Sequence, residues 1–262
     1  AVATSPFRAL FVPSQTPMPL SFDVLTPASD LRVAAITPFT SIDFPGKLSA
    51  VVFLRGCPWR CVYCHNGWMR TRSRQEGDPT WDDVQRLLEK RKGLLDGVVY
   101  SGGEPCMDPA LNAAVRLTKD MGYAVGLHTG GAYPRRLKEC LPFVDWVGLD
   151  VKADPQDEAV YDAIVGIKGA CRAFLESFEA IRETGVAFET RTTAHPDYLS
   201  EENILRLAHW LAERGVESYA LQIFRRAPGM QTDYDPVPDS WPSQAVLDEL
   251  KGLFKPFTLR RG

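Results

Sequence analysis

Residues 48–66 read Leu48-Ser-Ala-Val-Val-Phe-Leu-Arg-Gly-Cys57-Pro-Trp-Arg-Cys61-Val-Tyr-Cys64-His-Asn. The first seven residues form an apolar run with β-branched side chains, which predicts a buried strand. Three cysteines follow where this strand ends, and their spacing is Cys-x3-Cys-x2-Cys. Thiolates favour soft metals and iron–sulfur clusters. The segment therefore predicts a metal or cluster site at the end of a strand.

Predicted strands and helices alternate along the rest of the chain. The strands are expected at 48–54, 97–100, 123–127, 144–149, 186–192 and 218–223. The helices are expected at 81–92 with Thr80 as N-cap, 109–121, 170–184 closed by Gly185, 201–214 and 244–254. This alternation implies a parallel sheet with right-handed crossovers. Six such units favour an α/β partial barrel, a (β/α)6 variant of the TIM barrel. A doubly wound sheet stays open because spacing does not determine strand order.

The composition fits one α/β domain. A chain of 262 residues with 45% hydrophobic residues can bury a sizeable core. Residues 1–30 contain five prolines and are predicted to form an N-terminal extension, followed by the domain at 31–262. The net charge of −3 argues against a nucleic-acid partner, and no apolar run reaches the roughly 18 residues of a membrane span. Six cysteines, three of them within eight residues, indicate a reduced cytoplasmic protein and no secreted disulfide framework.

The number of clustered cysteines narrows the kind of site. A structural zinc site uses four protein ligands, and a 4Fe–4S electron carrier uses four cysteines. Cys57, Cys61 and Cys64 provide three, and His65 is poorly placed to complete a tetrahedron because it adjoins Cys64. Three ligands on a four-iron cluster leave one iron open to a substrate or cofactor. A zinc site completed by a distant Cys or His, or an electron-transfer module, remains the alternative.

The cysteine spacing, with Tyr63 before the last cysteine, resembles the radical S-adenosylmethionine superfamily over roughly residues 33–226. The motifs Asp43-Phe-Pro-Gly46-Lys and Cys64-His-Asn66 resemble those of the activating enzymes of glycyl radical enzymes. The whole run from Thr37 to Asn66 is most similar to the anaerobic ribonucleoside-triphosphate reductase activating proteins. The resemblance therefore implies a partial barrel of the radical S-adenosylmethionine type and an oxidoreductase that acts on a partner enzyme.

The same resemblance implies the chemistry. A 4Fe–4S cluster would be held by Cys57, Cys61 and Cys64, and its open iron would chelate the amino and carboxylate groups of S-adenosylmethionine. One electron would cleave that cofactor to methionine and a 5′-deoxyadenosyl radical. The radical would abstract hydrogen from the Cα of a glycine in the partner, with anaerobic ribonucleotide reductase expected. A flavodoxin-like protein is the electron donor usual for the family.

Further candidates follow the predicted strands at the end where the cysteines lie. Sites of parallel barrels form at the carboxyl ends of the strands, so these residues should converge. Two glycines after a strand, as in Ser101-Gly102-Gly103-Glu104, allow another group to approach the backbone closely. In the family this motif holds the amino group of the cofactor. An ordinary turn with the same two glycines is the alternative interpretation. The candidates for cofactor binding are Tyr63, Ser101, Gly102, Gly103, Glu104, Thr129, Gly130, Asp150, Lys152, His195 and Phe224.

Asp150-x-Lys152 resembles a pair in the glycyl-radical activators. There the aspartate is tied to a monovalent cation or the cofactor, and the lysine lies near the cofactor; a strand-end ion pair is the alternative. Activators often carry an acidic residue before the threonine, whereas this chain has His128 before Thr129. Because of that departure, no cation site is predicted.

Two residues are assigned to the substrate side by resemblance. Asp43 would meet the glycine loop of the partner, and Arg191 would face the same loop. Asp before Pro-Gly is also an ordinary turn residue, and Arg191 could form a structural salt bridge. His195 could instead cap the next helix, and Phe224 could be a core aromatic. The partner itself stays open among glycyl radical enzymes, and a small-molecule substrate is the remaining alternative.

Overall fold

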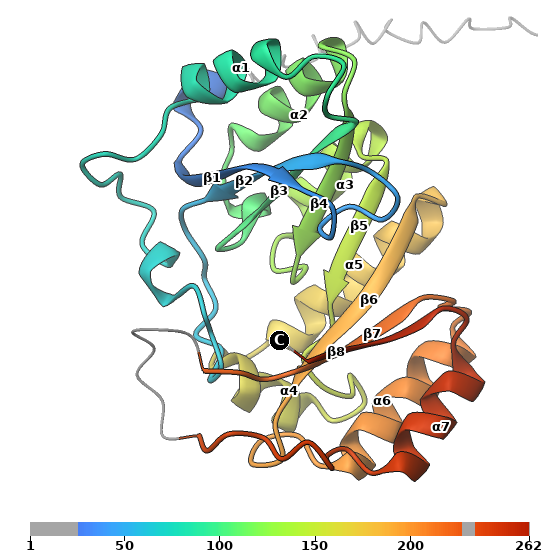
Figure 1. Ribbon diagram of the computed structural model, residues 1–262. Helices are drawn as coiled ribbons and strands as arrows, with labels where there is room; N and C mark the ends of the chain where they lie inside the picture. The colour runs from blue at the N-terminus through green and yellow to red at the C-terminus, as the bar shows by residue number, and fades with distance from the viewer. Residues whose placement is uncertain (1–25, 227–233, 262) are drawn as a thin grey trace, which may run out of the picture.

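The computed structural model describes residues 26–226 and 234–261. An eight-stranded sheet forms its centre, with the helices packed on the outer side of the curved sheet (Figure 1). The strands are β1 (Val33–Thr40), β2 (Ser49–Leu54), β3 (Gly97–Gly102), β4 (Ala124–Thr129), β5 (Trp146–Asp150), β6 (Ala187–Ala194), β7 (Tyr219–Ile223) and β8 (Phe257–Arg261). The helices are α1 (Trp81–Lys90), α2 (Leu111–Asp120), α3 (Pro134–Cys140), α4 (Glu158–Val165), α5 (Ala170–Thr184), α6 (Glu201–Glu213) and α7 (Gln244–Leu253). Short 3-10 turns are η1 (Ala28–Asp30), η2 (Gly67–Met69), η3 (Pro105–Met107) and η4 (Leu141–Phe143).

The strand order decides between the two architectures that spacing left open. The strands lie in chain order from β1 to β8, without the reversal that a doubly wound sheet requires. Neighbours from β2 to β8 are parallel, and β1 pairs antiparallel with β2. The partial α/β barrel is therefore confirmed. The six predicted strands correspond to β2–β7.

The prediction of six strands was wrong by two, because β1 and β8 flank the expected six. β1 contains Pro38, which an edge strand tolerates, and its register is interrupted twice by irregularities. β8 carries Arg260 on its inner face, so its pattern is not apolar. Within the described part of the predicted extension, Ala28 is buried. Residues 1–25 of the predicted extension lie outside the described residues.

Alternation along the strands creates two apolar layers. Ala50, Val52 and Leu54 of β2 pack with the helices in the large outer core. Val51, between them, joins a small inner cluster that also contains Val99, Phe44 and Trp146. Phe44 belongs to the β1–β2 loop, and its ring stacks on that of Trp146 with centroids 5.7 Å apart. The loop therefore turns into the concave side of the barrel, which we call the lumen.

Local signals placed most helices correctly. Thr80 caps α1 as predicted: its hydroxyl accepts from the amide of Asp83, whose carboxylate accepts from the amide of Thr80. Gly185 ends α5 with a φ of 68°, as predicted. The short helices α3 and α4 were not expected. Within the described residues, no helix is long and apolar enough to cross a membrane.

Candidate active site

Backbone hydrogen bonds hold the cysteine segment on both sides. Near its start, the amide of Cys57 donates to the carbonyl of Arg70 at 3.0 Å. In its middle, the amides of Arg60 and Val62 donate to the carbonyls of Val165 and Ile164 at the end of α4, at 2.9 and 3.0 Å. The segment is thus fastened to two separate parts of the chain, which orients its thiols.

The three cysteines of the motif line one pocket of about 160 Å³. Cys57, Cys61 and Cys64 are free thiols and partly exposed. Across residues 26–226 and 234–261, no three His, Cys, Asp or Glu side chains converge to hold a single metal ion. The motif supplies three thiols, one fewer than the four protein ligands of a structural zinc site, so the donor set fits a four-iron cluster with one open iron better than zinc.

Burial disfavours the thiolate forms of Cys57 and Cys61. Burial raises the pKa of Cys57 to about 12, and the charge of Glu104 adds to this. Burial also raises the pKa of Cys61, opposed by the charge of Lys152. Metal ligation requires thiolates, so binding of iron must displace these protons.

The two glycines after β3 are needed by the fold of the site itself. A Cβ on Gly102, which has a φ of +117°, would overlap the backbone of Leu54 at the end of β2. A Cβ on Gly103 would overlap the carbonyl of Gly56, which accepts from the amide of Glu104 at 2.7 Å. The backbone that approaches these glycines therefore includes the start of the cysteine segment. Both glycines also line the pocket.

Glu104 joins the ends of β3 and β4. Its side chain is buried, and one oxygen accepts from the hydroxyl of Thr129 at 2.7 Å and from the amide of Cys106 at 3.1 Å. The other oxygen accepts from the amide of Gly130 at 3.0 Å. Burial raises the pKa of Glu104, while these three donors oppose the shift. A bound ammonium group would be a fitting further donor to this carboxylate.

Asp150 and Lys152 form an ion pair in the wall of the same pocket, at the end of β5. The Lys152 ammonium lies 3.0 Å from Oδ2 of Asp150 and 5.4 Å from the ring centre of Tyr63. Burial lowers the pKa of Lys152, but the charges of Asp150, Tyr63 and Cys61 and the hydrogen bond to Asp150 together outweigh this, so the net shift is upward. Tyr63 is buried, and its ring stacks on Tyr198 at 5.1 Å. The pair is thus both a strand-end salt bridge and part of the pocket wall.

The two residues predicted for the substrate side lie deeper in the lumen. Asp43 accepts from the Thr40 hydroxyl at 2.6 Å, and its backbone carbonyl accepts from Nε2 of His128 at 3.0 Å. Arg191 is 9% exposed and donates to Asp150. Neither residue is among those that line the cysteine pocket.

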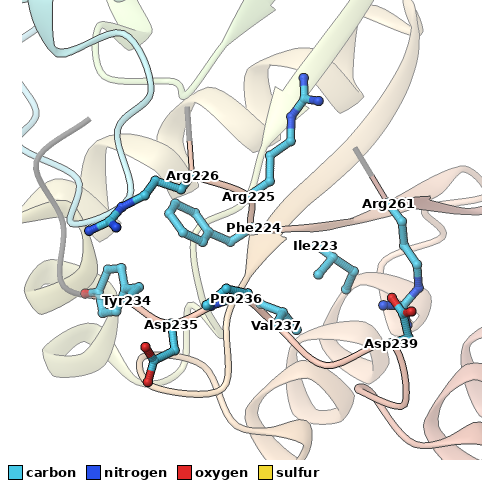
Figure 2. A pocket seen from close by; sticks show the side chains of 10 residues that line it. All are labelled: Ile223, Phe224, Arg225, Arg226, Tyr234, Asp235, Pro236, Val237, Asp239 and Arg261. Carbon is cyan, nitrogen blue, oxygen red and sulfur yellow. The ribbon is translucent and has the colours of Figure 1, made fainter. Parts of the chain in front are cut away.

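His195 and Phe224 lie behind the cysteine pocket. His195 is buried; its Nδ1 accepts from the amide of Asp197, in the turn before α6, and its Nε2 donates to the carbonyl of Asp235. Phe224 belongs to the large core and lines a separate pocket of about 240 Å³. Figure 2 shows its ring above Tyr234 and Pro236. His65 connects the two pockets, since its ring lies 5.5 Å from that of Phe224.

Seven of the eleven residues predicted to bind the cofactor line the cysteine pocket. They are Tyr63, Gly102, Gly103, Glu104, Gly130, Asp150 and Lys152. Ser101, Thr129, His195 and Phe224 are outside that lining. Thr129 supports Glu104 from behind.

Sequence reasoning assigned no role in the site to several residues of the pocket wall. Trp59 and Thr193 line it, together with His65 and Arg70. Asn66 also lines it and donates to the carbonyl of Gly102 at 3.3 Å. Thr193 had a usable signal, because it shares a strand face with Arg191 two residues earlier. Trp59 packs against Gly130 so closely that a Cβ there would overlap its ring, a contact without any local signal.

Comparisons with known proteins agree with this geometry. The family model of the Radical SAM superfamily matches residues 51–211. A Methanocaldococcus jannaschii protein, provisionally named a glycyl-radical enzyme activating enzyme, is 29% identical over 86% of this chain and 92% of its own length. The pyruvate formate-lyase-activating enzyme of Clostridium pasteurianum is 32% identical over 72% of this chain and 80% of its own.

A solved structure supports the fold alone. Streptococcus suis SuiB is similar with a TM-score of 0.60 and 14% identity, over 79% of this chain and 47% of its own length. The chain therefore spans about half of that longer protein.

The fold and the three-thiol pocket define an iron–sulfur enzyme of the partial-barrel type. The chain belongs to the radical SAM superfamily and, within it, to the enzymes that activate glycyl radical enzymes. Its cofactors are accordingly a 4Fe–4S cluster and S-adenosylmethionine.

Proposed function

We propose that this enzyme abstracts hydrogen from a glycine Cα of an anaerobic ribonucleoside-triphosphate reductase. The observation that carries the proposal is the single pocket in which three motif thiols face Glu104 and the Asp150–Lys152 pair. The bound cluster and S-adenosylmethionine supply the electron transfer and the radical chemistry. The protein's part is to hold both groups and to keep water from the reacting atoms.

The pocket residues divide into three roles. Cys57, Cys61 and Cys64 hold the cluster as thiolates. Glu104 would accept from the ammonium of the cofactor's methionine portion. Gly102, Gly103 and Gly130 leave room for Leu54, Gly56 and Trp59 in the frame of the pocket. Ser101 and Thr129 support the strand ends. Lys152 and Asp150, at the end of β5, would contact the cofactor from the same pocket wall. The buried ring of Tyr63 and the partly buried ring of Tyr198 exclude water behind the thiols. His195 and Phe224 support that layer.

The substrate side is assigned to the lumen. Asp43 and Arg191 lie on its inner surface, where a glycine loop of the partner would approach the cofactor. Asp43 keeps one carboxylate partner, Thr40, and remains partly exposed. The carboxylate of Asp43 can accept hydrogen bonds and the guanidinium of Arg191 can donate them. The pair therefore suits an extended peptide backbone, which carries both donors and acceptors.

The choice of the reductase as partner rests on the run from Thr37 to Asn66, which is most similar to the reductase activators. A second candidate is a pyruvate formate-lyase type of partner. It is favoured by the 32% identity to the Clostridium pasteurianum activating enzyme.

We further propose a flavodoxin-like electron donor and a cytoplasmic location. The location is supported by the six cysteines, which are all free thiols.

The test is a partner exchange. The anaerobically reconstituted, reduced protein is mixed with S-adenosylmethionine and either the reductase or pyruvate formate-lyase, and the glycyl radical is counted by electron paramagnetic resonance. We expect a radical with the reductase, none with Cys61→Ala, and an unchanged yield with Cys140→Ala, a buried thiol outside the pocket. A radical that forms in pyruvate formate-lyase but not in the reductase would show that the partner is pyruvate formate-lyase. Formation of 5′-deoxyadenosine with no radical on either protein would contradict both candidates.

A further inference from the structure

The guanidinium of Arg191 occupies a cradle at the inner end of β5. Its Nε donates to Oδ1 of Asp150 at 3.1 Å, and its Nη2 donates to the carbonyl of Gly148 at 3.1 Å. Asp150 is paired with Arg191 across the β5–β6 register. One carbonyl and one carboxylate oxygen thus converge on a single positive group, which is the kind of ligand set that binds a small cation.

Gly148 is the residue that makes room for this group. A Cβ at that position would lie 2.8 Å from Cζ and from Nη1 of Arg191. The φ of Gly148 lies outside the positive region, so the backbone conformation does not require glycine. Glycine is therefore needed at position 148 because any side chain there would overlap the Arg191 guanidinium.

The chain itself already supplies more positive than negative charge around the cradle. The other oxygen of Asp150, Oδ2, lies 3.0 Å from the Lys152 ammonium, so the one carboxylate has two positive partners. His128 stands where related activators often have an acidic residue. It contributes no negative charge, since its Nε2 donates to the carbonyl of Asp43. Throughout the described ranges, no three acidic, His or Cys side chains gather to hold an ion.

The monovalent cation that the resemblance to glycyl-radical activators implied therefore does not fit here. We propose that the guanidinium of Arg191 is the resident cation of this site and that the enzyme binds S-adenosylmethionine without an alkali metal ion. Arg191 is then a positioning residue: it does not line the cofactor pocket, whereas Asp150 and Lys152 do. It keeps the Asp150 carboxylate ionised and turned toward Lys152. The inference deepens the proposed function, since it rests on that pair lying at the cofactor.

The experiment measures affinity for S-adenosylmethionine by calorimetry on the reconstituted holoprotein. Each variant is studied in tetramethylammonium chloride and in potassium or sodium chloride of equal ionic strength. We expect the wild-type affinity to change less than twofold between salts. In tetramethylammonium, Arg191→Ala should bind at least tenfold more weakly. Potassium, sodium or a few millimolar guanidinium should restore part of that loss, because the emptied cradle then accepts an external cation.

Two variants make the result specific. Arg191→Lys keeps a tethered positive charge and should stay independent of alkali ions. Arg260→Ala removes another lumen arginine, which pairs with Glu189 at 2.9 Å, and should create no salt dependence. Circular dichroism and the melting temperature of each variant, measured in both salts, verify folding. If Arg191→Ala fails to fold, the wild type and Arg191→Lys carry the test.

Three outcomes would overturn the proposal. One is a wild-type affinity that falls tenfold without alkali ions. Another is a folded Arg191→Ala variant that binds S-adenosylmethionine with wild-type affinity in tetramethylammonium chloride. The third is a loss of affinity in Arg191→Ala that neither an alkali ion nor guanidinium restores. Because the measured quantity is cofactor affinity, none of these results depends on which partner is activated. A failure of the partner exchange would leave this inference standing.

Discussion

The stability of this protein should fall on acidification because of one lumen residue, His128. Its Nε2 donates to the carbonyl of Asp43, and its ring meets the edge of Trp146 with centroids 5.6 Å apart. Burial lowers the pKa of His128 to about 3, and the nearby charge of Arg191 contributes. The imidazole is therefore neutral in the folded protein at pH values well above 3.

The sign and size of the effect follow from proton linkage. The pKa of His128 in the unfolded chain is 6.5, so between pH 6.5 and about 3 only the unfolded state binds the proton. Stability is therefore lost as the pH falls through 6.5, at about 1.4 kcal/mol per pH unit. At pH 5 the loss is about 2 kcal/mol. This is an upper limit, because the ring keeps partial exposure to water in the lumen.

The assay is urea unfolding followed by tryptophan fluorescence, under anaerobic conditions at pH 7 and pH 5. His128→Gln keeps a donor for the Asp43 carbonyl but has no proton to gain. The wild type should lose up to about 2 kcal/mol more than this variant between the two pH values. His209→Gln, at an exposed histidine beside Glu249, is the matched control and should behave as the wild type does. Equal losses in wild type and His128→Gln would refute the reasoning.

Three further substitutions test other parts of the site. Cys61→Ala should remove the cluster and cofactor cleavage together, as measured by iron content and 5′-deoxyadenosine; cleavage without cluster loss would contradict its role as a ligand. Asp43→Asn should spare cleavage in the absence of partner and lower the glycyl radical yield about tenfold or more, whereas loss of all cleavage would place Asp43 with the cofactor. Gly130→Ala should lower stability by about 1–3 kcal/mol, because the new methyl overlaps the ring of Trp59. Gly252→Ala, with open space around it, is the control and should not lower the melting temperature. Equal melting temperatures of Gly130→Ala and Gly252→Ala would show that the Trp59 ring moves aside at no cost in stability.

Local sequence patterns predicted much of this protein because their causes are local. The triple-cysteine spacing depends only on neighbours in the chain, and the Thr80 cap of α1 needs one residue three positions on. Apolar runs bounded by glycines located β2–β7 for the same reason. Strand ends in a parallel sheet share one edge, so the convergence of Glu104 with Asp150 and Lys152 also followed from the order of elements.

The tertiary structure alone decided the features that join distant residues. β1 and β8 could not be recognised, since an edge strand with Pro38 and a strand with an inward Arg260 lack the apolar pattern. His195 and Phe224 follow strand ends like the other candidates, yet packing places them behind the pocket.

The question of the cation was likewise decided in three dimensions. From sequence, His128 only raised a doubt about an ion. The position of the Arg191 guanidinium over Gly148, a residue 43 positions away, supplies the positive charge instead. The sequence by itself determined that most candidate residues lie at one edge of the sheet, because the cysteine spacing and the order of strands are properties of the chain alone. Charge balance at the strand ends depends on which side chains of neighbouring strands come within about 3 Å of each other, and only folding brings those together.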